Sequence, residues 1–499
     1  MQHLNPIDAA FLQMESPRTP MHVGGLLTFR LPDNAPPDFL RALFAQQRAQ
    51  LPTTAPFNQR LVPKRMPKLS PAWETATNID IDYHLRHAAL PYPGGERELG
   101  VLVARLHSHP LDLHRPPWEI TLIEGLENRR FAFFFKVHHS AVDGMGALKF
   151  VRRWLSKDPS LLDPPALWAL PPQEHDAADE ADRKAAASRF RKTLASVRTQ
   201  TRAAGELAGT LRRMARKRDN PEGGILSAFA TPATPLNVAI TPQRRLATQL
   251  FELSRIKALS ASTGTTVNDV SLALIAGAVR RYLLELGGLP KTALIASVPV
   301  GLPRADGKPG NAVAGFVVPL ETQHEDPLAR LRVVRAVTQR TKEQLKSMSP
   351  EALGQFTLLG LSPLILGQLG RVLSHLPPIF NFVVSNVVAS KEPLYIAGAE
   401  LEAMYPISVL FDGYALNVTI VGYHDKLALG FTGCRDALPS LQRLAVYSIE
   451  SLEELERAAG IAASATAATR GKANASRPGS PGAPARTARK ATRRKARST

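Results

Sequence analysis

Apolar residues recur along the chain with two spacings, and each spacing predicts a different kind of element. Short apolar runs rich in Phe, Val and Ile predict strands. These runs span residues 119–124, 131–137, 293–300, 382–388, 416–422 and 427–432. The first two runs are separated by turn residues at 127–130, and the last two by 424–426. Spacings of three and four predict helices over 267–285 and 327–346. Strands and helices mixed in both halves indicate an α/β fold.

Three changes in composition divide the chain. Residues 1–172 and 225–460 are mixed and globular, whereas 173–224 are rich in Ala, Arg and Lys, and 461–499 are of low complexity. We therefore predict an N-terminal domain, a basic helical linker, a C-terminal domain and a disordered basic tail. The linker has one apolar helical face, made of Phe190, Leu194, Val197, Thr201, Ala204, Leu207, Leu211 and Met214. This face favours a helix that bridges the domains, and the alternative is an amphipathic helix on an anionic lipid surface.

The net charge of +19 is concentrated in two segments. Residues 183–218 hold twelve Lys and Arg and one acidic residue, and residues 461–499 hold ten Lys and Arg and no acidic residue. The other 40 basic and 42 acidic residues nearly cancel. This distribution argues against a specific nucleic-acid-binding core and predicts two local contacts with anionic partners.

The sequence predicts neither secretion nor a membrane span. The N-terminus lacks a basic start before an apolar run, and the most apolar window, 356–369, is interrupted by Gly360 and three further Gly, Ser or Pro residues. Cys434 is the only cysteine, which excludes a disulfide framework and fits a reducing compartment. We expect a cytoplasmic protein whose contact with the inner membrane or with lipid inclusions is peripheral.

The strongest chemical signal is the heptapeptide from His138 to Gly144, which reads His-His-Ser-Ala-Val-Asp-Gly. It directly follows the predicted strand 131–137. The pattern His-His-x-x-x-Asp-Gly should arise by chance only ~0.001 times in a chain with these residue frequencies. Adjacent residues at a strand end point to opposite faces, so one histidine faces a reaction channel and the other packs or orients it.

A histidine without a nearby carboxylate partner in the sequence suits proton removal from an attacking hydroxyl. Imidazole has a reference pKa of ~6.5 and is mostly a free base at neutral pH. When the hydroxyl attacks a thioester, the acyl donor is already activated and no enzyme nucleophile is required. Ser140 lacks the flanking glycines of a nucleophile elbow and is interpreted as structural. Zinc is not expected, because the histidines diverge and no Glu or Cys stands at ligand spacing.

With this heptapeptide and several further motifs, the chain resembles the bacterial bifunctional wax ester synthase/acyl-CoA:diacylglycerol acyltransferases. They are a branch of the CoA-dependent acyltransferases, which include chloramphenicol acetyltransferase and peptide-synthetase condensation domains. The resemblance covers residues 1–460. Its further motifs are residues 6–11, 20–24, 110–119, 267–270, 382–386, 431–436 and 438–439. The chain departs from the family pattern at 387–391, where a Val-Pro-Gly-Pro-like turn is usual, and at Pro117, where leucine is commoner.

The resemblance implies an α/β fold of two chloramphenicol-acetyltransferase-like domains, with the active-site channel between them. It implies that His139 is the general base and that His138 supports it. Asp143 is expected to hold the motif loop, and Gly144 to permit the turn behind it. Trp118 is expected to pack at the channel wall next to the substrate.

Three positions of the second domain are also implied as site residues. Asn268, at a helix start, is expected either to donate a hydrogen bond to the tetrahedral oxyanion or to act as an N-cap. Asp269 is a first-turn acid favoured by the helix dipole and is grouped with the substrate-binding residues. Gly360 lies in the segment 356–366, which either lines an acyl tunnel or forms a buried helix.

The implied activity is an acyl-CoA-dependent O-acyltransferase that makes wax esters from fatty alcohols or triacylglycerol from diacylglycerol. Acyl-CoA is a substrate, and no bound cofactor or metal is implied. The expected partners are acyl-CoA, the alcohol or diacylglycerol, and a lipid surface. Two alternatives stay open: a condensation-type transferase with a carrier-protein thioester as donor, and a protein that coats nucleic acid or inclusions through its basic tail.

Overall fold

The computed structural model describes most of both predicted domains. The described residues are 2–4, 6–62, 71–142, 144–171, 231–303, 309–347, 364, 367–368, 370, 373–375 and 377–461. The predicted linker 173–224, both of its predicted boundaries and residues 462–499 of the predicted tail therefore lie outside the described residues. Asp143 and Gly360 lie outside them too.

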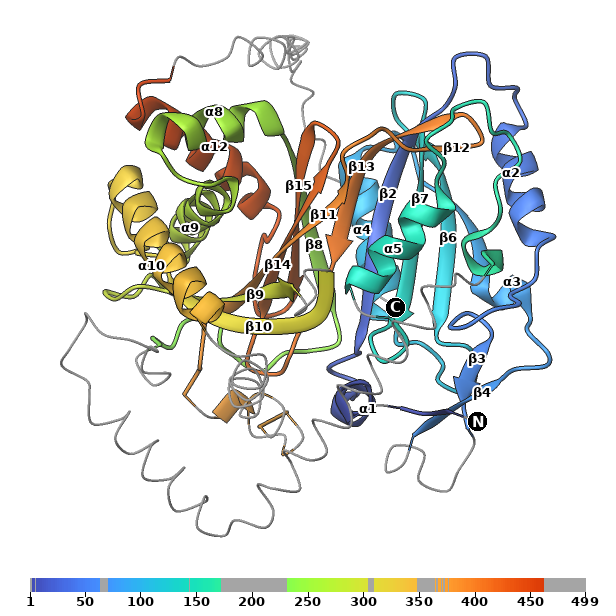
Figure 1. Ribbon diagram of the computed structural model, residues 1–499, viewed down its shortest axis with the longest axis horizontal. Helices are drawn as coiled ribbons and strands as arrows, with labels where there is room; N and C mark the ends of the chain where they lie inside the picture. Colours follow the sequence, from blue (N-terminus) through green and yellow to red (C-terminus); the bar gives the residue numbers. More distant parts are fainter. Residues whose placement is uncertain are drawn as a thin grey trace, which may run out of the picture.

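Two six-stranded sheets, each with its own helices, form the two halves of the molecule, which lie side by side (Figure 1). The first sheet has the order β12-β13-β2-β7-β6-β5. Its strands are β2 His22–Arg30, β5 Leu85–Ala89, β6 Trp118–Leu126, β7 Arg130–His138, β12 Tyr395–Ile396 and β13 Ala399–Ile407. The second sheet has the order β10-β9-β11-β14-β15-β8. Its strands are β8 Arg244–Glu252, β9 Ile295–Pro303, β10 Pro309–Pro319, β11 Phe382–Ser390, β14 Leu416–Tyr423 and β15 Lys426–Cys434.

A small third sheet and the helices complete the described structure. The third sheet consists of β1 Gln2–His3, β4 Ala72–Thr75 and β3 Gln59–Leu61. The α-helices of the first half are α1 Pro6–Met14, α2 Phe39–Arg48, α3 Ile81–His84, α4 Glu96–Ser108 and α5 Gly144–Trp154. Those of the second half are α8 Leu253–Thr263, α9 Val267–Glu285, α10 Pro327–Ser347 and α12 Arg443–Ala458.

The predicted strands and helices are confirmed. Each predicted strand overlaps an observed one, and the two predicted hairpins are the antiparallel pairs β6–β7 and β14–β15. The predicted helix 267–285 is α9, and 327–346 lies within α10. Helix α9 is apolar on almost every side because it is buried among the other helices and the second sheet.

One segment of the second half belongs to the first sheet. Strand β13 pairs antiparallel with β2, and β12 pairs with β13, so residues 395–407 extend the first sheet at its edge. The prediction of a continuous C-terminal domain over 225–460 did not foresee this exchange. Its physical reason is that a strand pairs with whichever sheet edge its backbone reaches, and the hydrophobic pattern does not encode that partner.

The two halves meet through apolar side chains of both sheets. Leu246 of β8 and Ala428 of β15 pack with Phe134 of β7 and Tyr405 of β13. The backbones also pack closely at Gly430, where an added Cβ would lie 2.1 Å from the carbonyl oxygen of Pro406. This contact holds the two sheets in a fixed relation along the joint between the halves.

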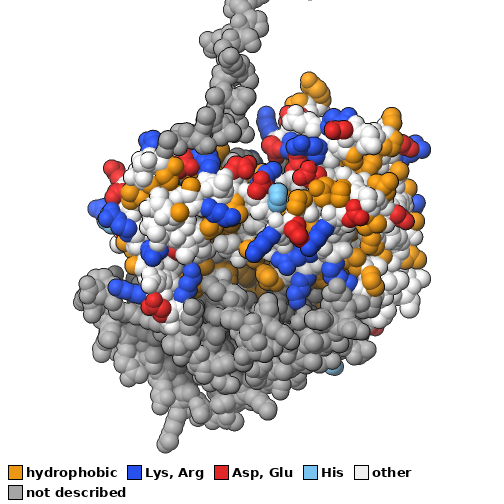
Figure 2. Space-filling view, turned by 45° about the horizontal axis from the view of Figure 1, so that its top comes forward, with side chains coloured by type: hydrophobic (Ala, Val, Ile, Leu, Met, Phe, Trp, Pro, Cys, Tyr) orange, Lys and Arg blue, Asp and Glu red, His pale blue; other side chains and the backbone are white. Residues whose placement is uncertain are grey.

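The surface in Figure 2 shows no extended area of one charge. Lys and Arg side chains are interspersed there with Asp, Glu and small apolar areas. This agrees with the near balance of charge outside the two basic segments. Among the described residues, no helix is both long and apolar enough to cross a bilayer.

Candidate active site

The two motif histidines stand at the end of β7, where β2 and β6 begin on either side. Strand β7 is hydrogen-bonded to both neighbours along its length. The pairing continues past the strand, because the His138 amide donates to the Pro117 carbonyl (2.9 Å) and the His139 amide donates to the Met21 carbonyl (2.8 Å). Both histidine backbones are thus held by neighbouring segments of the first half.

The side chains of the two histidines lie in different surroundings. His138 is fully buried, whereas His139 is partly exposed. The strand-end position predicts this divergence. Of the two imidazoles, His139 is therefore the more accessible one.

Both ring nitrogens of His138 are engaged. Its Nδ1 lies 2.6 Å from the Ser140 hydroxyl and accepts a hydrogen bond from the Ser140 amide at 3.1 Å. Its Nε2 lies 2.5 Å from Oε2 of Glu15. Ser140 is itself buried, which agrees with a structural role for its hydroxyl.

Helix α1 borders the site, which was not predicted from the sequence. Glu15 stands 123 residues before His138, and no carboxylate partner was expected for the histidine pair. The fold supplies one because the end of α1 packs against the end of β7. Phe11, on the same helix, stacks on His139 with the ring centroids 3.9 Å apart and the planes 14° apart. The family-like segment 6–11 was the sequence signal that pointed to this helix.

The last motif position, Gly144, begins helix α5 and is exposed. Its φ lies outside the left-handed region, and no heavy atom lies within 4 Å of the Cβ that a side chain would add. The backbone therefore does not require glycine there for a turn, which differs from the predicted reason for this residue.

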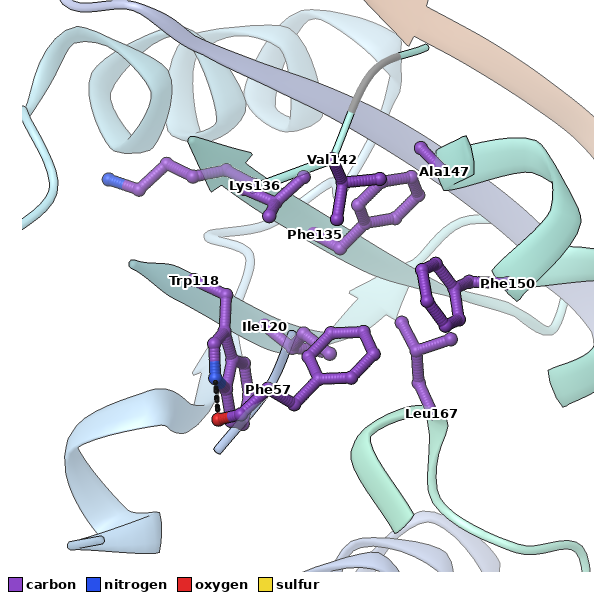
Figure 3. Close-up of a pocket in the computed structure, with 10 residues that line it drawn as sticks. Phe57, Trp118, Ile120, Phe135, Lys136, Val142, Ala147, Phe150 and Leu167 are labelled. Atoms are coloured by element: carbon purple, nitrogen blue, oxygen red, sulfur yellow. Dashed lines mark hydrogen bonds between the residues drawn. The ribbon is translucent and has the colours of Figure 1, made fainter. Parts of the chain in front are cut away.

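An apolar pocket lies next to the motif loop, between β6, β7 and α5 (Figure 3). It is lined by Phe57, Trp118, Ile120, Phe135, Lys136, Val137, Val142, Ala147, Phe150 and Leu167. Almost all of this lining is aliphatic or aromatic, and the ammonium group of Lys136 points away from it (Figure 3). The lining is apolar, but its free volume of about 20 Å³ has room for about one water-sized molecule, so in this structure it is a packing gap that does not hold a hydrocarbon chain.

Trp118 forms one wall of this pocket as a rigid packing residue. It is 2% exposed, and its indole N–H donates to the Phe57 carbonyl at 2.8 Å. Its ring stacks on His84 with centroids 4.4 Å apart, and on Trp168 at 5.4 Å. Burial, the main cause, lowers the pKa of His84, so this imidazole is neutral beside the indole at neutral pH.

Three buried ionisable side chains on the other side of β7 have no role in the predicted chemistry: His22, His107 and Lys136. Burial lowers the pKa of His107 to about 3 and holds the pKa of His22 well below its ordinary value. Nε2 of His22 lies 2.8 Å from the His107 carbonyl oxygen. Lys136 is 1% exposed and pairs with Glu119 at 3.1 Å. Both histidines are therefore neutral at neutral pH, and the lysine charge is compensated.

The structure at the start of α9 distinguishes between the two roles that were predicted for Asn268, oxyanion donor and N-cap. The N-cap is Thr266, so the alternative that Asn268 caps the helix is wrong. Asp269 completes a capping box with Thr266 and also accepts a 2.6 Å hydrogen bond from Thr338. Asp269 is 2% exposed, and both carboxylate oxygens are engaged within the protein. The geometry thus gives Asp269 a structural task.

Asn268 is oriented by a residue of β11. The Asn386 amide nitrogen donates to the Asn268 amide oxygen at 3.1 Å. Strand β11 also contacts the helix that follows the histidine motif, because Arg152 of α5 donates to the carbonyls of Val388 and Ala389. Contacts through β11 therefore connect the Asn268 region of the second half with α5 of the first.

Two α/β halves, with a His-His-x-x-x-Asp-Gly motif at a strand end, define the class of fold to which peptide-synthetase condensation domains also belong. The first condensation domain of the CDA synthetase has the same fold, with a TM-score of 0.56 at 19% identity over 93% of this chain and 97% of that chain. Residues 4–271 match the wax ester synthase/diacylglycerol acyltransferase catalytic domain, and residues 309–456 match the WS/DGAT C-terminal domain. The chain belongs to the wax ester synthase/diacylglycerol acyltransferase family and is an O-acyltransferase.

Proteins of similar sequence match this chain over nearly its whole length. A Mycobacterium tuberculosis protein named as a diacylglycerol O-acyltransferase is 48% identical over 450 residues, which cover 90% of this chain and 97% of the relative. The O-acyltransferase WSD of Acinetobacter baylyi is 36% identical, covering 90% and 95%. The structure of the wax ester synthase/diacylglycerol acyltransferase from Marinobacter aquaeolei VT8 superposes with a TM-score of 0.75 at 37% identity, covering 92% and 100%.

Proposed function

We propose that this protein transfers a fatty acyl group from acyl-CoA to a fatty alcohol or to diacylglycerol. The names of its relatives support these acceptors. The observation that carries the proposal is the position of His139, which is partly exposed at the end of β7, close to a pocket of apolar side chains. A base near apolar side chains suits acyl transfer to a lipid hydroxyl.

His139 is the general base in this proposal. Its imidazole removes the proton of the acceptor hydroxyl while the oxygen attacks the thioester carbonyl. The tetrahedral intermediate then expels the CoA thiolate, which takes the proton back from the imidazolium. The new bond is the ester C–O bond, the broken bond is C–S, and no acyl-enzyme forms.

Asn268 stabilises the oxyanion of this intermediate. The Asn268 amide oxygen accepts a hydrogen bond from Asn386. The NH₂ group of Asn268 therefore points away from Asn386 and is left as a donor. A donor to an oxyanion is worth roughly 3 kcal/mol in other enzymes. In this proposal the apolar side chains around Trp118 and Phe150 contact the hydrocarbon part of a substrate.

Acyl-CoA enters as a substrate, and the chemistry uses no bound cofactor. The acceptors and products are lipids, so we place the enzyme at the cytoplasmic surface of the inner membrane or on lipid inclusions, held peripherally. The basic segments 183–218 and 461–499 supply the attraction to anionic lipid, at about 1 kcal/mol for each Lys or Arg near the surface. No specific nucleic acid is a partner in this proposal.

The test is CoA-thiol release by the purified full-length protein with palmitoyl-CoA, with hexadecanol or diacylglycerol in separate reactions. We expect acceptor-dependent release that falls by about 10²–10⁴ in His139→Ala. The matched control is His114→Ala, because the side chain of His114 is 93% exposed. Full activity in a folded His139→Ala variant contradicts the role of the base. No release by the wild type, but release from a carrier-protein thioester, favours the condensation-type alternative.

A further inference from the structure

Helix α1 and the residue that follows it contact the two histidines of the motif. Phe11 lies in α1, and Glu15 directly follows Met14, the last residue of that helix. The Phe11 ring lies on His139, and the Glu15 carboxylate lies against His138. Both contacts are made across a large sequence separation, so they depend on how α1 docks.

The hydrogen bonds of His138 determine which nitrogen carries its proton. The Ser140 amide can only donate, so Nδ1 of His138 must be an acceptor. The hydrogen of the neutral ring is therefore on Nε2, which donates to Glu15. The Glu15 side chain is only 9% exposed, and a carboxylate so far out of water needs a donor of this kind.

The stack of Phe11 on His139 restricts the second imidazole differently. The near-parallel rings, at 3.9 Å, cover one face of the imidazole. The backbone of His139 is already fixed by its bond to Met21. With the main chain held and one ring face covered, the imidazole keeps one orientation, which proton transfer to a ring nitrogen requires.

We propose that Glu15 and Phe11 are positioning residues for the acyltransfer reaction. Glu15 fixes the tautomer of His138 and puts a negative charge beside the histidine pair, where a positive charge develops on His139 in the transition state. Phe11 fixes the ring plane of His139. The inference rests on the proposed function, because it assigns these residues to the same general-base step.

Two other ionisable groups stand near His138 on β2 and β7. His22 pairs with His138 across β2 and β7, and its burial keeps it neutral. Lys136, two residues earlier on β7, is paired with Glu119. These two described neighbours on β2 and β7 thus add little net charge beside the histidine pair.

The test compares Glu15→Gln, Phe11→Leu and Phe11→Tyr in the full-length protein, with Gln13→Ala, an exposed position on the same helix, as control. Glutamine keeps an acceptor for Nε2 but removes the charge. We expect Glu15→Gln to lower kcat by about 10- to 100-fold, with KM for palmitoyl-CoA within about twofold. We also expect the acid limb of its kcat/KM profile to move to lower pH, because the imidazolium loses a nearby negative charge. A merely structural role lowers activity without moving the profile.

Phe11→Leu should lower kcat without moving the pH profile, and Phe11→Tyr, which keeps the ring, should restore most of it. Wild-type kcat and an unmoved profile in folded Glu15→Gln overturn the assignment of Glu15. Full activity in Phe11→Leu overturns that of Phe11. If thermal unfolding shows that Glu15→Gln is not folded, Glu15→Asp replaces it in the test. We expect Glu15→Asp to lower kcat, because the shorter side chain reaches His138 less well. An inactive wild type is instead a failure of the proposed function, and this inference falls with it.

Discussion

Asn386 of β11 donates a 3.1 Å hydrogen bond to the amide oxygen of Asn268 at the start of α9. The bond joins two family-like motifs that are 118 residues apart in the sequence. It occupies the acceptor of Asn268 and leaves its NH₂ as the donor that the proposed oxyanion interaction requires. The side chain that orients the amide is therefore part of the same arrangement.

The first prediction concerns this pair. Asn268→Ala should lower kcat by about 10²–10³ with little change in KM, because the lost bond forms only in the transition state. Asn386→Ala should lower kcat by a smaller factor, because Asn268 remains but is no longer oriented. The measurement is steady-state CoA release, with the exposed Asn34→Ala as control. An Asn386→Ala variant more impaired than Asn268→Ala is inconsistent with this order of roles.

The apolar pocket should set the preferred chain length. Ala147 of α5 is the smallest side chain of this apolar lining, so Ala147→Phe puts a bulky ring where the proposal has the hydrocarbon chain contact the protein. We expect the variant to favour shorter acyl or alcohol chains, with a decrease in kcat/KM of about 10-fold or more for the longest. The measurement is a chain-length series for donor and acceptor separately. An unchanged preference in both series places the hydrocarbon elsewhere.

The joint between the halves should depend on Gly430. A Cβ there would lie 2.1 Å from the Pro406 carbonyl oxygen, so Gly430→Ala must push β13 and β15 apart. We expect a loss of about 1–3 kcal/mol in the free energy of unfolding. Gly100→Ala is the control, because nothing lies within 4 Å of its added Cβ and it sits inside α4. Urea unfolding of both variants decides, and equal stability of the two would argue against the tight contact.

The free energy of unfolding should decrease in mild acid because of His107. Its pKa is about 3 in the folded protein and ~6.5 when unfolded, so between these values the unfolded state binds more protons. The contribution is fully present above pH ~6.5 and is lost as the pH falls towards 3, at about 1.4 kcal/mol for each pH unit from this residue. His107→Gln should reduce that slope in urea unfolding measured from pH 7 to pH 5. A slope identical to that of the wild type would mean that His107 does not remain neutral in the fold.

Much of the architecture was predictable because its signals are local. The apolar run 131–137 and the spacing in 267–285 identified β7 and α9 with nearly correct ends. The histidine motif was found because it follows a strand directly in the sequence. Thr266 as the N-cap of α9 was equally readable, since Thr-x-x-Asp before an apolar run is a helix-start pattern.

The elements, the motif and the family can be read from the sequence, because periodicity and short motifs depend on neighbouring residues. The contacts of Glu15 with His138 and of Asn386 with Asn268, and the pairing of β13 with the first sheet, arise only in the folded chain. These relations link residues more than 100 positions apart. They are set by how helices and sheet edges dock, and docking is chosen by the packing of the whole core rather than by any local pattern.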